Sequence, residues 1–366
     1  MDRRTVEQRT ILLSISGSQA YRLNTPTSDQ DYKGVCVGLK KHYLGFEKFD
    51  QKDGGWTQEP GEFGFLDGVK DIVIYELRKY MQLAIENNPN ILELLWQDPK
   101  DYRVITPVGQ RLIDHRQAFL CTKAKHSFSG YAFAQLKRIE MHRKWLLNPV
   151  EQAPTPEEFG IVGIEPMSKE QMNAFLEFLY VIIQDRIAFS EIEEEFATFL
   201  EQRVDFKGAL KQYPLEANLL GYVQKLTKSS DNFIHLLHAT QNYQTAMKAY
   251  QNYQHWKANR NPMRSALEAK VGYDAKHAMH CLRLLHMGIE ILKDGVVIVN
   301  REKAGDAPLL RSVRNCEYSY DQIIAMATES QAELENLYRT STLPKTVDRA
   351  AMSELCEELV EIQGWN

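Results

Sequence analysis

The stretch "SISGSQAYRLNTPTSDQDYKGVCVGL", residues 14–39, places a Gly-Ser pair shortly before two aspartates, Asp29 and Asp31. We predict a strand over residues 29–39, and side chains two positions apart on a strand lie on the same face. Two carboxylates on one half-buried face repel each other and destabilise the fold unless a cation lies between them. The aspartate pair therefore predicts a site for a divalent metal ion.

The residues around this stretch predict a small α/β unit. A buried strand is expected over residues 11–15, ending at the Gly-Ser pair. A Gly- and Asp-rich surface loop over residues 50–68 precedes a strand over 71–75, which runs into an amphipathic helix over 76–86. The order of strands and helices places the aspartate pair within this unit.

After about residue 116, helical periodicity dominates the chain. We therefore predict the α+β fold class, with an α/β domain over residues 1–115 and a mainly helical domain over residues 116–366. The predicted helices cover residues 131–147, 169–203, 216–250 and 275–292, and a short strand is expected over 296–299.

Composition sets limits on the partners of the chain. Its 366 residues with 43% hydrophobic content suffice for two domains. The net charge of −5 requires that any contact with nucleic acid come from a local basic patch. The cysteines show no paired spacing, which argues against a zinc site or a disulfide framework. They are Cys36, Cys121, Cys281, Cys316 and Cys356.

The location expected from the sequence is the cytoplasm. The charged start MDRRTVEQRT leads into only a short apolar run, which predicts no signal peptide. No stretch approaches the roughly 18 consecutive apolar residues that a membrane span requires.

The Gly-Ser pair, ten residues and then Asp-x-Asp resemble the signature of the DNA polymerase β-like nucleotidyltransferase superfamily. Either half alone is common in turns and surface strands, so the combination is what indicates function. The resemblance implies that Gly17 and Ser18 bind the triphosphate of an NTP. It also implies that Asp29 and Asp31 bind Mg²⁺, with Mn²⁺ as an alternative, because carboxylate oxygens suit hard cations.

Longer segments resemble one bacterial and phage branch of this superfamily that gene association links to RNA repair. The resemblance extends to about residue 325. It departs from the branch at Arg22, where a glycine is expected after the tyrosine, although an arginine there could contact phosphate. The segments are SGSQAY…TPTSDQDYKGV, YELRKYMQLAIENNPNILELLW, GYDAKHAMHCLRLLHMGIEIL and SVRNCEYSYDQI.

The resemblance also implies a third carboxylate on an adjacent strand, which would bind metal and accept the proton of the attacking hydroxyl. Asp71 is the first choice because it starts a strand that leads directly into a helix. Glu93 is the alternative, although its apolar neighbours also fit a structural acid that is paired with a base.

The predicted helix over residues 275–292 carries three basic side chains on one face. Lys276, His280 and Arg283 have the spacing i, i+4, i+7, opposite an apolar stripe. Three potential cations on one face favour an anion opposite them, so these residues are candidates for nucleotide binding. An exposed polar face is the alternative, and the family resemblance favours function.

A basic zone with interleaved aromatic residues covers residues 123–144. Such a zone suits single-stranded nucleic acid, through phosphate contacts and base stacking. An amphipathic helix with buried aromatics and solvated bases would give the same pattern. The candidates for RNA contact are Lys123, Lys125, Lys137 and Arg138.

Together these features predict a polymerase β-like enzyme that transfers a nucleoside monophosphate from an NTP to a hydroxyl and releases pyrophosphate. The predicted acceptor is an RNA 3′ end. A protein or small-molecule hydroxyl is an alternative acceptor, and a non-catalytic RNA-binding protein with the same fold is the other alternative. The patterns leave open which NTP is used and which oligomeric state the chain adopts.

Overall fold

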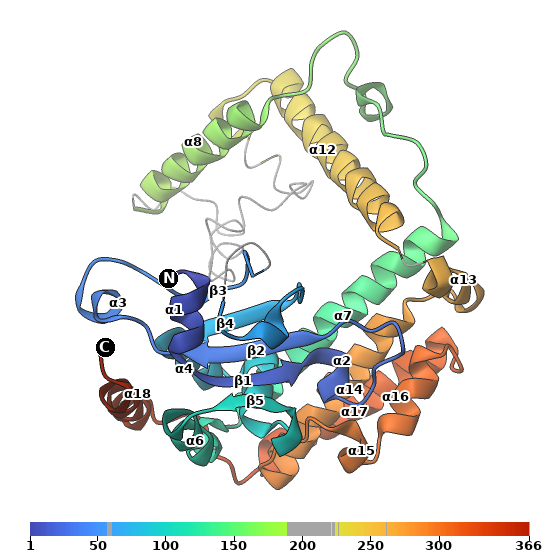
Figure 1. The fold of residues 1–366 in the computed structure, drawn as a ribbon. Coiled ribbons are helices and arrows are strands. Elements are labelled where there is room, and N and C mark those ends of the chain that lie inside the picture. The colour runs from blue at the N-terminus through green and yellow to red at the C-terminus, as the bar shows by residue number, and fades with distance from the viewer. Residues whose placement is uncertain (57–60, 189–220, 222–223, 226, 261, 366) are drawn as a thin grey trace. The chain divides into compact units, whose positions relative to one another are not determined.

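The computed structural model describes residues 1–56, 61–188, 221, 224–225, 227–260 and 262–365 (Figure 1). The chain divides into two compact units. Met1–Leu147 and Met263–Asn366 together form the first unit, and Asn148–Pro262 form the second. The predicted boundary between residues 115 and 116 thus lies inside the first unit, and the second unit is an insertion between its two segments.

Five short strands form one mixed sheet in the first unit. They are β1 (Thr10–Ser16), β2 (Asp31–Cys36), β3 (Gln51–Lys52), β4 (Ile72–Glu76) and β5 (Tyr102–Ile105). Their order across the sheet is β3-β4-β2-β1-β5. Strand β1 runs antiparallel to β2 and β5, and β3 runs antiparallel to β4. Strands β2 and β4 are parallel, so their N-terminal ends meet at the same edge of the sheet.

Both faces of this sheet are covered, as the sequence of β1 requires. Every residue of β1 is buried. Leu12 packs into the larger core, which includes Val35 of β2 and many helix residues, whereas Leu13 packs on the opposite face with Ile72 and Ile74 of β4. Because side chains alternate along a strand, three consecutive apolar residues, Ile11–Leu13, fit a strand that lies between two layers.

The helices of the first unit come from both of its chain segments. The N-terminal segment contributes α1 (Arg3–Gln8), α2 (Gly17–Ala20), α3 (Lys40–Leu44), η1 (Gly64–Leu66), α4 (Leu77–Ile85), α5 (Pro89–Leu92), η2 (Glu93–Trp96), η3 (Pro99–Asp101), α6 (Pro107–Asp114), η4 (Arg116–Phe119) and α7 (Ala124–Leu147). The C-terminal segment contributes α13 (Pro262–Val271), α14 (Ala275–Asp294), α15 (Arg301–Ala304), α16 (Ala307–Arg314), α17 (Tyr320–Thr340) and α18 (Arg349–Gln363).

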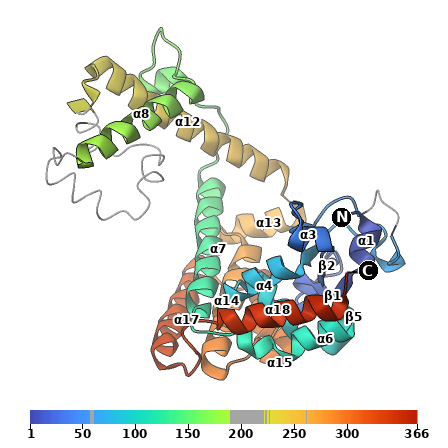
Figure 2. The ribbon, with the colours of Figure 1, turned by 90° about the vertical axis from the view of Figure 1, so that its left-hand side faces the viewer.

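Helix α14 joins the two segments into one unit. It packs against α7 from the N-terminal segment and against α16 and α17 from its own segment (Figures 1 and 2). Buried Phe128 of α7 and Leu282 of α14 belong to the same core as Leu12 of β1. Because sheet and helices share this core, no boundary between compact units falls near residue 116.

The second unit contains η5 (Pro156–Phe159), α8 (Lys169–Ala188) and α12 (Asp231–Ala258). Met172 of α8 and Leu237 of α12 are buried together, and the Met167 amide donates a hydrogen bond to Oγ1 of Thr240 at 3.2 Å. The predicted helices over 169–203 and 216–250 correspond to α8 and α12. Their parts within residues 189–220 lie outside the described residues.

The mixed α/β architecture with a mainly helical C-terminal region is confirmed, but individual elements differ from the prediction. The strand predicted over 296–299 is wrong, because these residues form no ladder; Val297 and Val299 are buried in the helical core, and this alternation resembles a strand. Strands β3 and β5 were not predicted. Within the described part of the chain, no helix has the length and apolar character needed to cross a membrane.

Candidate functional site

Asp31 and Asp71 lie beside each other where two parallel strands begin. Asp31 is the first residue of β2, and Asp71 immediately precedes β4. Tyr32 pairs with Ile72, and the Tyr32 amide donates a hydrogen bond to the Asp71 carbonyl oxygen at 2.8 Å. The parallel register therefore brings the two acids to one edge of the sheet.

Asp29 is also part of this group, although not through the predicted strand. Strand β2 starts at Asp31, so the prediction that residue 29 lies in the strand is wrong, and Asp29 is exposed in the preceding loop. Burial, followed by the negative charges of Asp71 and Asp29, raises the pKa of Asp31. Asp71 and Asp29 are thus each close enough to Asp31 for their charges to act on it.

Gly17 leaves the space in which the Asp31 carboxylate lies. Gly17 follows Ser16, which is the cross-strand partner of Asp31. A Cβ atom built on Gly17 would lie 2.0 Å from Oδ2 of Asp31, and the φ of Gly17 is +64°. Both the space and the left-handed backbone require glycine here. The half-buried Ser18 follows, so the Gly-Ser pair lies at the acidic group.

The donor chemistry of this acidic group fits a hard divalent cation. Asp29, Asp31 and Asp71 offer only carboxylate oxygens, which are the ligands that Mg²⁺ and Mn²⁺ prefer. Burial and the charges of Asp71 and Asp29 raise the pKa of Asp31, and a bound cation would favour its ionised form. We call Asp29, Asp31 and Asp71 the acidic site.

Helix α14 brings one exposed lysine to the acidic site. Lys276 is exposed, and its positive charge opposes the rise in the pKa of Asp31. His280 is different, because burial and then the charges of Arg283 and Lys276 lower its pKa well below the usual range. His280 is therefore neutral near pH 7, which corrects the prediction of three cations on this face.

Arg283 is a predicted nucleotide contact whose charge is already paired inside the protein. The residue is buried, and its Nη1 lies 2.8 Å from Oε1 of Glu93. Its guanidinium lies 3.8 Å from the centre of the Tyr21 ring, and the Tyr21 hydroxyl donates a hydrogen bond to Oε2 of Glu93 at 2.5 Å. Because its charge is balanced inside the protein, Arg283 lacks the free charge that the predicted nucleotide contact requires. Glu93 is buried and paired with a base, as expected for the structural acid named as the alternative.

Lys33 was missed by the sequence analysis. It lies two residues after Asp31 on β2 and therefore on the same face of the sheet. Its Nζ donates a hydrogen bond to the Asn90 carbonyl oxygen at 3.1 Å, and burial lowers its pKa. Its charge also opposes the rise in the pKa of Asp31. The spacing Asp-x-Lys was the available signal.

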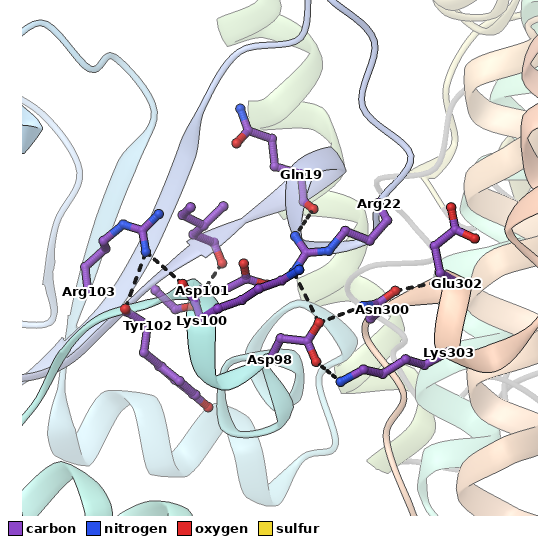
Figure 3. A network of polar contacts seen from close by, with 12 residues as sticks. Gln19, Arg22, Asp98, Lys100, Asp101, Tyr102, Arg103, Asn300, Glu302 and Lys303 are labelled. Carbon is purple, nitrogen blue, oxygen red and sulfur yellow. Dashed lines mark hydrogen bonds and ion pairs between the residues drawn. The ribbon is translucent and has the colours of Figure 1, made fainter.

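The structure explains why a glycine is expected at position 22. Arg22 has a φ of +62°, a conformation in which glycine has no steric penalty. Its Nη2 atom lies 2.6 Å from Oδ2 of Asp101 and 3.2 Å from Oδ2 of Asp98 (Figure 3). These ion pairs balance the charge of Arg22, so the suggested contact with phosphate lacks support.

The same network ties the residues after the Gly-Ser pair to the C-terminal segment. Asp98 also accepts a hydrogen bond from Asn300 Nδ2 at 2.6 Å and pairs with Lys303 of α15 (Figure 3). Arg22 Nη1 donates to the carbonyl oxygen of Gln19 in α2 at 2.7 Å. Arg22 and Asp98 thus link the short helix of the predicted triphosphate site to Asn300 and Lys303.

The basic residues of the predicted RNA-contact zone differ in whether an acidic partner balances their charge. Lys123 pairs with Glu86, and Lys125 pairs with Glu335 at 2.6 Å. Lys137 and Arg138 are exposed on α7 and form no ion pair among the residues that the structure describes. Of the aromatic residues in the zone and directly after it, Phe128 and Trp145 are buried, whereas Tyr131 and Phe133 are exposed.

Comparison with known families agrees with this geometry. Residues 2–148 match the RlaP family, described as the RNA repair pathway DNA polymerase beta family. The predicted resemblance is confirmed. The RlaP match includes Gly17, Asp29, Asp31 and Asp71, whereas Lys276 lies beyond it. The predicted extension of the resemblance to about residue 325 stays a prediction.

A curated bacterial protein is also similar to the chain. Bacillus subtilis (strain 168) protein YcgL, described as uncharacterized, is 26% identical over 196 residues, which cover 51% of this chain and 67% of YcgL. No solved structure matches the chain. The N-terminal part of the chain is therefore similar to the RNA repair pathway DNA polymerase beta family, and the description of YcgL adds no activity.

Proposed function

We propose that the chain is a nucleotidyltransferase that joins a nucleoside monophosphate from an NTP to the 3′ hydroxyl of an RNA. The observation that carries this proposal is the position of Asp31 between Asp71, Asp29 and Gly17. The RlaP match over residues 2–148 supports RNA repair as the setting.

The acidic site would hold Mg²⁺, or Mn²⁺, through Asp29, Asp31 and Asp71. When bound, the ion would supply positive charge to the phosphate oxygens and lower the charge repulsion of the transition state. Gly17 and Ser18 would bind the triphosphate, because the missing Cβ lets phosphate oxygens approach the backbone and the Ser18 hydroxyl can donate a hydrogen bond.

The proton of the acceptor hydroxyl would move to the Asp71 carboxylate. The hydroxyl oxygen then forms a bond to the α-phosphorus, and the bond from that phosphorus to the bridging oxygen breaks, so that pyrophosphate leaves. Asp71 is assigned this role because it lies beside Asp31 in the parallel register and is exposed to a substrate.

Two lysines would neutralise charge near the reacting phosphates. Lys276 is exposed and acts on Asp31, and Lys33 acts on Asp31 from the same strand face. Arg283 is not given this role because Glu93 already balances its charge. His280 is assigned to the nucleotide only as a neutral hydrogen-bonding group.

Exposed Lys137 and Arg138 are the proposed RNA contacts. Lys123 and Lys125 would contribute less, because each already has an acidic partner. Phosphate contacts from exposed cations and stacking on the exposed rings Tyr131 and Phe133 would fit a single strand.

The test is transfer of label from each of the four α-labelled NTPs to an RNA oligonucleotide in the presence of Mg²⁺. We expect labelled RNA with a free 3′ hydroxyl, no labelled product from RNA with a blocked 3′ end, and no product with the Asp31→Asn variant. Label that appears on protein instead of RNA would move the assignment to a protein acceptor. Absence of transfer with every NTP, and with Mn²⁺ in place of Mg²⁺, would contradict the enzymatic assignment.

A further inference from the structure

Three side chains with metal-ligand chemistry meet at the N-terminal end of α14, apart from the acidic site. His142 comes from α7, Asp274 is the N-cap residue of α14, and His277 lies in the first turn of that helix. Each of the three offers one candidate ligand atom, and these atoms all lie within 4.8 Å of one another. Among the residues that the structure describes, no other three His, Cys or acidic side chains meet this criterion.

The two imidazoles approach the same carboxylate oxygen. Nδ1 of His142 lies 2.9 Å from Oδ2 of Asp274, and Nδ1 of His277 lies 2.8 Å from the same atom. The other oxygen, Oδ1, accepts the hydrogen bond from the His277 amide that caps the helix. The helix cap thus fixes the Asp274 carboxylate through Oδ1, and Oδ2 faces the two histidines.

The group is enclosed on most sides. The side chains of His142 and Asp274 are 10% and 9% exposed, and that of His277 is 21% exposed. The two imidazole rings meet edge to face, with their centroids 5.2 Å apart, and His142 stacks on Trp145. Packing therefore fixes the orientation of His142, while His277 keeps an open side.

The contact between His277 and Asp274 has the distance of a hydrogen bond but not its direction. Nδ1 of His277 is buried and donates no hydrogen bond, although it is 2.8 Å from Oδ2. Two ligands of one metal ion show this relationship, because each lone pair is directed at the ion and not at the other ligand. Tetrahedral ligands at about 2.0–2.2 Å from zinc lie roughly 3.3–3.6 Å apart, so a movement of roughly 0.4–0.8 Å would admit an ion.

We propose that His142, Asp274 and His277 bind one divalent transition-metal ion of the zinc class. Two imidazole nitrogens and one carboxylate oxygen are typical ligands of zinc, whereas Mg²⁺ favours oxygen ligands. Three protein ligands leave a fourth position that water or another small ligand would fill. The ion would hold α7 against the start of α14, from which Lys276 acts on Asp31.

This site is independent of the proposed nucleotidyl transfer. The test uses the full chain without an affinity tag, dialysed against a chelator and then titrated calorimetrically with Zn²⁺ in the presence of excess Mg²⁺, which occupies the acidic site. We expect one zinc ion per chain, and visible absorption bands typical of a tetrahedral site when Co²⁺ replaces Zn²⁺. Wild-type protein that binds no Zn²⁺ under these conditions overturns the proposal.

Variants identify the ligands. His277→Ala and His142→Asn should each weaken Zn²⁺ binding by roughly 100-fold or more, at least as much as the loss of an outer-shell partner. His286→Asn is the matched control, because His286 lies on the same helix with its Nδ1 2.7 Å from Oδ2 of a single acid, Asp306. Asp31→Asn should also keep zinc.

Circular dichroism must show that each variant is folded before its affinity is compared. Equal zinc affinity in wild type, His277→Ala and His142→Asn would mean that Asp274 only accepts hydrogen bonds from the histidines. Loss of zinc in Asp31→Asn, with retention in His277→Ala, would mean that zinc binds at the acidic site. Either outcome contradicts the proposal.

Discussion

Arg283 and Glu93 form a buried ion pair, with 2.8 Å between Nη1 of the arginine and Oε1 of the glutamate. Their side chains are 4% and 3% exposed, and 190 positions of sequence separate them. Removal of one partner would leave the other charge buried without compensation, which is a large energetic cost. Glu93 is therefore expected to contribute to stability, whereas the exposed Asp71 is the acid to which the proposed function assigns catalysis.

The first prediction compares Glu93→Gln with Asp71→Asn. Glu93→Gln should lower the free energy of unfolding by roughly 3–5 kcal/mol, because Arg283 would lose its counter-charge. Asp71 is exposed, so Asp71→Asn should change stability by only about 0.5 kcal/mol or less and lower the transfer rate by orders of magnitude. Urea unfolding and single-turnover transfer measure the two effects. If Glu93→Gln kept full stability but lost transfer, the two roles would have to be exchanged.

The second prediction concerns the pH dependence of stability at Asp31. Its pKa in the folded protein is above the ordinary value of 3.8, chiefly because of burial and secondly because of Asp71 and Asp29. A group with a raised folded-state pKa contributes stability below its ordinary pKa and loses that contribution as the pH rises through the folded-state value. Ionised Asp31 therefore destabilises the metal-free protein at neutral pH.

Asp31→Asn should accordingly raise the melting temperature of the metal-free protein at pH 7, with a smaller difference near pH 4, while transfer is lost. Mg²⁺ should raise the melting temperature of the wild type but not that of the variant. Thermal melts at both pH values, with and without Mg²⁺, measure these differences. A variant that melts below the wild type at pH 7 would show that Asp31 stabilises the fold.

The third prediction tests the RNA contacts on α7. Replacement of Lys137 and Arg138 by glutamine should reduce the slope of log affinity against log salt by about 0.7 for each lost phosphate contact with single-stranded RNA. The matched control replaces Lys123 and Lys125, whose charges are balanced by Glu86 and Glu335. RNA titrations at several salt concentrations should show a smaller change for the control pair. Equal effects of the two double variants would argue against an RNA path along the exposed residues.

The fourth prediction separates backbone strain from ion pairing at Arg22. Arg22→Ala and Arg22→Gly both remove the ion pairs with Asp98 and Asp101, so both should be less stable than the wild type. The glycine variant should be more stable than the alanine variant by about 1 kcal/mol, because the φ of +62° is unfavourable for a residue with a Cβ. Urea unfolding of the three proteins gives both comparisons, and an alanine variant as stable as the glycine variant would show that the backbone there relaxes.

The acidic site could be predicted from the sequence because its parts are close along the chain or lie in neighbouring strands. The Gly-Ser pair and Asp31 are joined by the β1–β2 pairing, and Asp71 starts the next strand of the sheet. The alternation argument placed Asp29 and Asp31 on one strand face, and it does not hold because β2 begins two residues after Asp29.

The positions of Arg283 and His142 could not be predicted, because each depends on a partner from a distant segment. Helical spacing placed Arg283 opposite the apolar stripe. In the structure that position is buried, because Glu93 from a distant segment packs against it. His142 lies within the basic zone of the sequence, but its partner in the structure is Asp274, which is 132 positions away along the chain. Cysteine spacing was used to judge zinc binding, and it gave no information about histidines on separate helices.

The inserted second unit has a consequence for the order of events during synthesis. Residues 148–262 leave the ribosome after α7 and before α14, and at roughly 5–20 residues per second this takes on the order of 10 s. During that interval the buried face of α7 has no α14 to cover it, and Asp31 has no Lys276. The nascent chain therefore exposes this apolar face of α7 until α14 has been synthesised, and chaperone binding is favoured during that interval.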